Sequence, residues 1–203
     1  MTSSYVIPVP GRFSGCYLDL ETVKVPTPDG YRMPNGEALK RRWSVTMAGV
    51  ARGGFVWIVD GNGRAAAEGN LLARLGELLA GAEVRYAATR EFDEMICRGR
   101  FTNARRAHLP VPTFPAVPGA ETLAWRNLGR LPEYPRGDDV ASRDVPAALA
   151  EGRWDLVAVH LLRDVAELIL AGGNPDDDCR IWCELVLTDC DFALGAVYGW
   201  GED

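Results

Sequence analysis

The sequence predicts an α/β domain built on a mixed sheet with helices around it. Apolar and acidic residues alternate over 15–22, which is typical of a strand, and two further strand segments over 43–52 and 54–60 are joined by a glycine pair. Leucines then recur at helical spacing over 71–79, and a buried strand is expected over 83–88. This order predicts a three-stranded antiparallel meander followed by parallel strands that alternate with helices.

The first strand segment separates its side chains by chemistry. Tyr17, Asp19 and Glu21 fall on one face, because successive residues of a strand point to opposite sides of the sheet. The other face carries apolar residues, namely Cys16, Leu18 and Leu20. Unpaired charges in a buried strand are costly, so the two acids are expected to serve a function.

Helices and a long proline-rich segment are expected in the rest of the chain. A helix over 91–100 places Phe92, Met95 and Ile96 on one face and is expected to end near Arg100. Its start lies directly after the predicted strand, which is the usual position of a helix in an α/β unit.

Prolines interrupt regular structure over 108–140, which we expect to be a long excursion with at most short helices. A short helix is then predicted over 145–151. A longer one is capped by Asp155 and runs to Ala171, before a glycine pair. The chain closes on two apolar segments whose type the pattern leaves open, 181–187 and 192–198.

The composition of the 203 residues is that of an ordinary globular protein, with 47% hydrophobic and 25% charged residues, and it predicts one domain over 1–203. The chain has neither an apolar run long enough for a membrane span nor a secretory start, so a cytoplasmic protein with no membrane partner is expected. Five irregularly spaced cysteines predict reduced thiols rather than a disulfide framework: Cys16, Cys97, Cys179, Cys183 and Cys190.

Charge is spread unevenly along this acidic chain, whose net charge is -6. Residues 85–106 contain six arginines and three acids, whereas 138–203 contain fifteen acids and four arginines. A basic surface for nucleic-acid phosphates is therefore compatible with an acidic whole.

The paired acids of the first strand suggest a metal site. Carboxylates at positions i and i+2 of a strand lie about 6 to 7 Å apart on one face. Further carboxylates from helices would complete a cluster of hard oxygen ligands, and such a cluster repels itself unless cations occupy it. Two divalent ions in such a site activate a water and stabilise the leaving oxygen of a phosphodiester.

Three motifs resemble those of the DEDD exonucleases, the superfamily of polymerase proofreading domains, oligoribonuclease and ribonuclease D. The segment Asp19-Leu-Glu-Thr22 matches the first motif, Asp-x-Glu-Thr on the first strand. The segment that ends in Phe-Asp93 resembles the second, at a helix start. The segment His160-Leu-Leu-Arg-Asp164 resembles the third motif. It has three residues between the His and the Asp, whereas the histidine branch of the family has four.

The resemblance implies a ribonuclease-H-like fold and a 3′-to-5′ exonuclease acting on single-stranded DNA or RNA. Two Mg²⁺ or Mn²⁺ ions would be held by the four acids of the motifs, Asp19, Glu21, Asp93 and Asp164. His160 would orient or deprotonate the attacking water. The residues expected to contact nucleic acid are Thr22, Arg90, Phe92, Arg105 and Arg106.

Two other functions stay open at this point. The altered spacing of the third motif favours a catalytically silent module that keeps the fold and binds nucleic acid or a protein partner. A hydrolase that uses Cys16 or Cys97 as its nucleophile is a third hypothesis, although no known nucleophile signature surrounds either thiol.

Overall fold

The computed structural model describes residues 3–24, 43–61, 65–86, 90–106, 108, 110–112, 124–136, 139–141 and 143–199. Its strands form one open mixed sheet in the order β1-β4-β3-β2-β5-β6. They are β1 (Ser3–Pro8), β2 (Cys16–Lys24), β3 (Trp43–Arg52), β4 (Phe55–Asp60), β5 (Val84–Tyr86) and β6 (Arg126–Asn127). The first four pair antiparallel, while β5 runs parallel to β2 and β6 runs parallel to β5.

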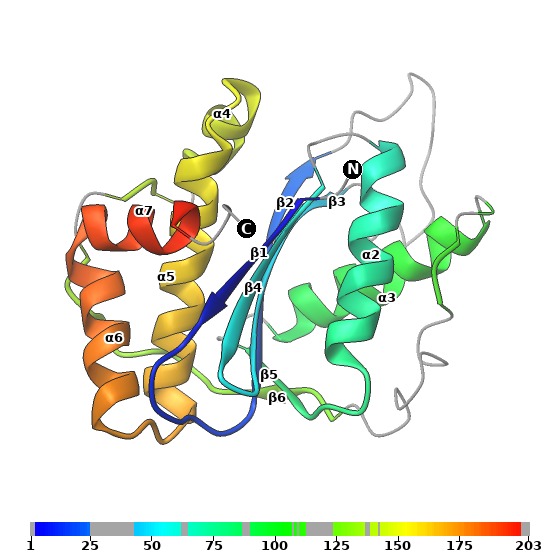
Figure 1. Ribbon diagram of the computed structural model, residues 1–203. Helices are drawn as coiled ribbons and strands as arrows, with labels where there is room; N and C mark the ends of the chain where they lie inside the picture. The colour runs from blue at the N-terminus through cyan, green and yellow to red at the C-terminus, as the bar shows by residue number, and fades with distance from the viewer. Residues whose placement is uncertain are drawn as a thin grey trace.

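Helices cover both faces of the sheet (Figure 1). One face carries α2 (Ala65–Leu79) and α3 (Arg90–Arg106). The other carries α4 (Val145–Ala150), α5 (Trp154–Gly172), α6 (Asp177–Thr188) and α7 (Cys190–Tyr198), with α5 lying directly on β2 and β3. No helix in the described ranges combines the length and the apolar character that a membrane crossing requires.

The alternation predicted for the first strand is confirmed. Tyr17 is fully buried in the core under α5 and α6, whereas Cys16, Leu18 and Leu20 pack into the separate core under α2 and α3. The meander is confirmed as well, and its β3–β4 turn needs Gly53 and Gly54 because both have a positive φ. The side chains of β2 thus supply both layers of the core.

Several sequence predictions need correction. The chain starts with a strand, β1, that the pattern did not reveal, and the proline-rich excursion contributes β6 to the sheet edge. The helix expected over 91–100 continues to Arg106. The two closing segments, whose type the pattern left open, are helices. Asp155 does not cap α5, because Arg153 occupies the N-cap and Asp155 lies inside the first turn. The sequence also predicts a turn over 60–63, of which residues 62 and 63 lie outside the described residues.

A glycine sets how closely α5 approaches the sheet. Gly49 pairs with Asp19 across β3 and β2, and a Cβ built on it would lie 2.8 Å from Cγ2 of Val165 and 3.4 Å from the carbonyl oxygen of Leu161. Only a residue without a side chain leaves room for the helix there. Because Val165 adjoins Asp164 in α5, this contact also fixes the height of Asp164 above Asp19.

A β-bulge follows Glu21 in β2, where the pairing with β3 shifts register between Glu21 and Thr22. The hydroxyl of Thr46 donates a 3.0 Å hydrogen bond to the carbonyl oxygen of Glu21 at this point. Bulges redirect side chains and are frequent beside functional sites. Here the irregularity lies next to the acids of β2.

Candidate metal centre

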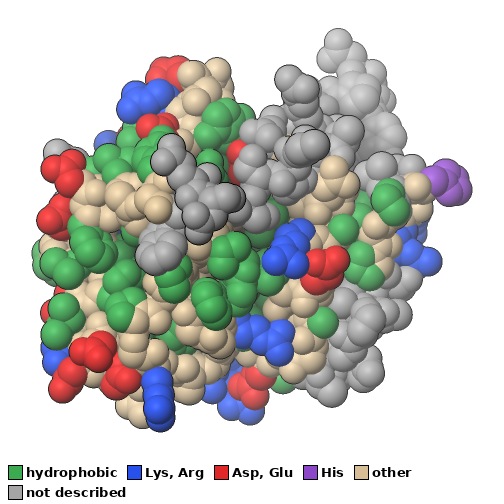
Figure 2. All heavy atoms as spheres, viewed as in Figure 1, with side chains coloured by type: hydrophobic (Ala, Val, Ile, Leu, Met, Phe, Trp, Pro, Cys, Tyr) green, Lys and Arg blue, Asp and Glu red, His purple; other side chains and the backbone are tan. Residues whose placement is uncertain are grey.

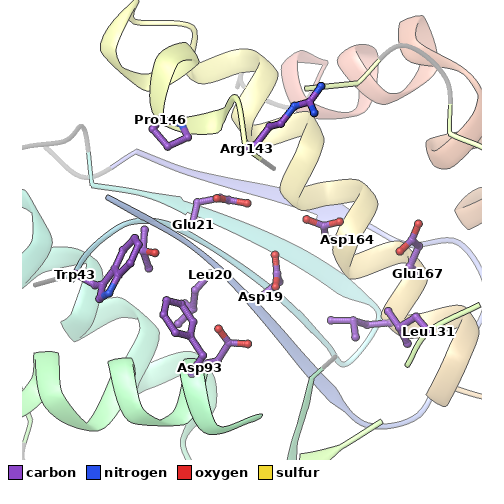
Figure 3. Close-up of a pocket in the computed structure, with 13 residues that line it drawn as sticks. Asp19, Leu20, Glu21, Trp43, Asp93, Leu131, Arg143, Pro146, Asp164 and Glu167 are labelled. Carbon is purple, nitrogen blue, oxygen red and sulfur yellow. The ribbon is translucent and has the colours of Figure 1, made fainter. Parts of the chain in front are cut away.

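Five acids line one cavity of about 540 Å³, and four of them are the acids of the three motifs. Asp19 and Glu21 come from β2, Asp93 from the start of α3, and Asp164 from α5. Figure 3 shows these side chains converging from the sheet and from the helices on its two faces. The structure therefore brings together the four acids that the three motifs predicted.

The carboxyl group of Asp19 lies in the centre of this cluster. Burial raises its pKa well above the usual range, and the neighbouring carboxylates of Asp164, Asp93 and Glu21 raise it further. Buried acids that repel each other are costly to keep ionised, and a bound cation is the ordinary way to offset that cost.

Glu21 shares this environment. Burial raises the pKa of Glu21 to about 7, and the carboxylates of Asp164, Asp93 and Asp139 act in the same direction, while His160 partly opposes them. At neutral pH its proton is therefore held loosely enough for a cation to replace it.

His160 is buried on α5, with 2% of its surface exposed. Its Nε2 lies 3.2 Å from Oδ2 of Asp164 and 3.5 Å from Oε1 of Glu21, and its Nδ1 lies 3.2 Å from both oxygens of Asp139. Burial alone would lower the pKa of the imidazole, but Asp139, Asp164 and Glu21 together raise it. Asp139 thus fixes the ring, which faces the acids of the site.

The cluster fits a divalent cation by its donor chemistry. Ligand atoms of Glu21, His160 and Asp164 lie within 4.8 Å of one another. Asp19 and Asp93 add carboxylates to the same cavity, and carboxylate oxygens are the preferred ligands of Mg²⁺ and Mn²⁺. The imidazole of His160 is thus a further potential ligand of the cation, whereas the motifs predicted that it orients or deprotonates the attacking water.

Apolar and aromatic side chains form the wall next to the acids. The rings of Trp43 and Phe92 meet edge to face, with centroids 5.5 Å apart. Both line the cavity, together with Thr22, Leu131 and Leu168. Thr22 and Phe92, which are predicted to contact nucleic acid, therefore lie beside the acids, whereas Trp43 had been interpreted only as the first residue of a strand.

The predicted arginines lie apart from the acids. Arg105 and Arg106 are exposed at the end of α3, roughly 18 Å along the helix from Asp93 at 1.5 Å per residue. Figure 2 shows basic side chains at that end of the molecule. The side chain of Arg90 lies outside the described residues.

The remaining arginines of the 85–106 region have structural partners. Arg85 donates to the carbonyl oxygen of Gly172, Arg98 pairs with Glu94, and Arg100 pairs with Glu68. The local arginine excess is therefore only partly available to phosphates.

Four charged residues beside the site escaped the sequence analysis, namely Arg136, Asp139, Arg143 and Glu167. Glu167 lies three residues after Asp164, on the same helical face, and this spacing was the available signal. Arg136 and Asp139 come from the proline-rich excursion, where no periodic pattern marks a position. Arg136 forms salt bridges with Asp139, Asp164 and Glu167.

The cysteine hypothesis receives no support from the structure. All five thiols are free, and Cys16 and Cys97 are buried. Burial raises the pKa of Cys16 to about 12 and raises that of Cys97 as well, so neither forms a thiolate readily.

Comparisons with known proteins found no family model, no curated protein and no solved structure that matches this chain. Its fold class is α/β with an open mixed sheet between helices.

Proposed function

We propose that this chain is a metal-dependent nuclease, a 3′-to-5′ exonuclease that hydrolyses single-stranded DNA or RNA with two divalent cations, Mg²⁺ or Mn²⁺. The observation that carries the proposal is the convergence of four acids, from β2, α3 and α5, on one cavity. They are Asp19, Glu21, Asp93 and Asp164.

These acids are the residues that would hold the cations. The raised pKa values of Asp19 and Glu21 support this role, because a cation compensates the repulsion that burial intensifies. When bound, two such ions supply an activated water and stabilise the leaving 3′ oxygen of a phosphodiester. The products would be a nucleoside monophosphate and a strand one nucleotide shorter.

The sheet topology supports a ribonuclease-H-like fold. The antiparallel strands β4, β3 and β2 are followed by parallel β5 and β6, and the acids lie on the central strand and on helices packed against both faces. This agrees with the order of the three motifs along the chain, which is the basis of the family resemblance.

The cavity wall supports a single-stranded substrate. Trp43 and Phe92 offer aromatic surface beside Asp93, and aromatic side chains bind unpaired bases by stacking without sequence preference. A base inside a duplex has no free face for such a contact, so the end of a single strand fits this wall better.

Incubation of the purified protein with 5′-labelled single-stranded DNA and RNA tests the proposal. We expect a ladder that shortens one nucleotide at a time from the 3′ end with Mg²⁺ or Mn²⁺, and no shortening with a chelator. Strands that stay intact in both metals would contradict the proposed activity. Cleavage that persists in the chelator would contradict the role of the metal.

One observation favours the second candidate, a catalytically silent module that binds nucleic acid or a protein partner. Asp164 contacts Arg136 through one carboxylate oxygen and His160 through the other, so protein side chains already balance the negative charge of this acid without a metal ion. A Mn²⁺ titration distinguishes the candidates. A silent module binds at most one weakly held ion, whereas the nuclease binds two.

A further inference from the structure

Arg136 reaches the acids of α5 from the proline-rich segment. Its guanidinium forms salt bridges with Asp139 through Nη1 at 2.9 Å, with Glu167 through Nε at 2.8 Å, and with Asp164 through Nη2. About a quarter of the side chain, 23%, is exposed. The guanidinium keeps its charge at any relevant pH, so a permanent cation lies beside the candidate metal centre.

Arg136 and His160 engage both carboxylate oxygens of Asp164. Nη2 of Arg136 contacts Oδ1, and Nε2 of His160 lies 3.2 Å from Oδ2. A divalent ion that bound Asp164 would lie close to the guanidinium, and two cations that share one carboxylate repel each other. Asp19 of β2 and Asp93 of α3 line the same cavity.

We propose that Arg136 is a built-in competitor of the second cation, and this inference rests on the metal site of the proposed function. While Nη2 holds Asp164, the site takes one ion through the acids of β2 and α3. The second ion binds with full affinity only when Nη2 leaves Asp164.

The contacts of Arg136 make such a release inexpensive. Its Nε and Nη1 groups keep Glu167 and Asp139 when Nη2 moves away, so the guanidinium stays paired. The alternative is a purely structural role, in which Arg136 fastens the proline-rich segment to α5 and leaves the cations unaffected.

Calorimetric titration of the metal-free protein with Mn²⁺ separates the two roles. The variant is Arg136→Gln, and the control is Arg143→Gln, because Arg143 lines the same cavity but is 87% exposed and pairs only with Asp144 in the described part of the chain. Both substitutions remove one positive charge near the site. Only the first removes a cation from Asp164.

For the wild-type protein we expect one stronger and one weaker Mn²⁺ site. In Arg136→Gln the weaker site should strengthen by roughly tenfold to a hundredfold, the usual scale for groups around a metal ligand, while Arg143→Gln stays like wild type. Identical titrations of wild type and Arg136→Gln would overturn the inference. Equal gains in both variants would also overturn it, since they would reflect net charge alone.

A second variant guards against misfolding of the first. Arg136→Lys keeps the charge but loses the fork that spans three acids, so its weaker Mn²⁺ site should lie between those of wild type and Arg136→Gln. If neither wild type nor any variant bound Mn²⁺, the result would contradict both this inference and the proposed metal site. If the titrations differ as expected but no protein cleaves a strand, the nuclease proposal falls and the competition by Arg136 stands.

Discussion

Nδ1 of His160 lies 3.2 Å from both carboxylate oxygens of Asp139. Its other nitrogen faces Glu21 and Asp164, so three acids surround a ring that is almost fully buried. A proton on the imidazole is stabilised by this setting, which is better suited to holding acids in place than to taking a proton from water. We therefore interpret His160 as a positioning residue for Glu21 and Asp164.

The setting of His160 predicts its titration in the metal-free protein. By NMR, His160 should titrate at a higher pH than a histidine in a peptide, because the three acids outweigh burial. In Asp139→Asn its pKa should fall, since the largest favourable contact is lost. An unchanged pKa of His160 in Asp139→Asn would contradict the role of Asp139.

The acids predict how stability varies with pH. Glu21 titrates at about 7 in the fold against an ordinary 4.5, and the pKa of Asp19 is raised as well, so the folded state binds more protons than the unfolded state in this range. The free energy of unfolding of the metal-free protein should therefore decrease as pH rises from about 5 to 8. His160, with its raised pKa, acts in the same direction. Asp139 acts in the opposite sense, but its contribution is complete above the ordinary pKa of 3.8.

Bound Mg²⁺ should reverse this trend, because the cation replaces the protons of Asp19 and Glu21. The rise in Tm produced by Mg²⁺ is thus expected to grow between about pH 5 and pH 8. Thermal melts with Mg²⁺ or chelator at both ends of the range measure it. A rise in Tm that is the same at both ends would show that these acids do not bind the ion.

The close contact of Gly49 with Val165 predicts the effect of a single methyl group. Gly49→Ala would press on Cγ2 of Val165 and should cost about 1–3 kcal/mol of stability, or roughly 2–4 °C in Tm for each kcal/mol. It should also weaken metal binding, because α5 carries Asp164. Gly195→Ala is the matched control, since a Cβ there meets nothing within 4 Å. Equal Tm values for the two variants would refute the tight packing of α5.

Much of the candidate site was predictable from local patterns. The alternation in β2 has a period of two, so it places Asp19 and Glu21 on one face without any knowledge of the fold. The strand-to-helix transition before Asp93 and the helical position of Asp164 then follow from ordinary periodicity. The sheet topology brings these elements to one place. The order of the three motifs along the chain was the basis for expecting such a topology.

The rest depended on long-range contacts that no local pattern encodes. Arg136 meets Asp164 across 28 residues, and Asp139 meets His160 across 21, both from a segment without regular structure. Strand β1 is a short apolar run, and about fifty residues of chain separate it from its partner strand β4. Such contacts depend on the assembled fold. They leave no helical or strand periodicity in the sequence from which they could be predicted.

The exposed end of α3 gives a prediction about substrate binding. Replacing Arg105 and Arg106 together by Gln should weaken binding of single strands of every sequence and reduce the salt slope by about 1.4, which is 0.7 for each phosphate contact. Replacing Arg153 and Arg180 by Gln is the control, because it makes the same change in charge at the N-cap of α5 and on α6. The affinity of each double variant for a single strand, measured over a range of salt concentrations, gives the two salt slopes to be compared. Equal salt slopes in the two double variants would place the path of the strand elsewhere.

The rate of 3′-terminal nucleotide release by Asp19→Asn, measured beside its Tm, tests the central claim most directly. Asp178→Asn, an exposed acid of α6, is the control. The four-acid metal centre predicts at least about a hundredfold loss of Mn²⁺-dependent release in Asp19→Asn, equivalent to about 2.7 kcal/mol of lost transition-state stabilisation, with no loss in the control. It also predicts a higher Tm for the metal-free Asp19→Asn protein, because the neutral amide removes the free-energy cost of keeping a buried carboxyl group protonated beside its acidic neighbours. Release by Asp19→Asn at the wild-type rate would contradict the proposed metal centre.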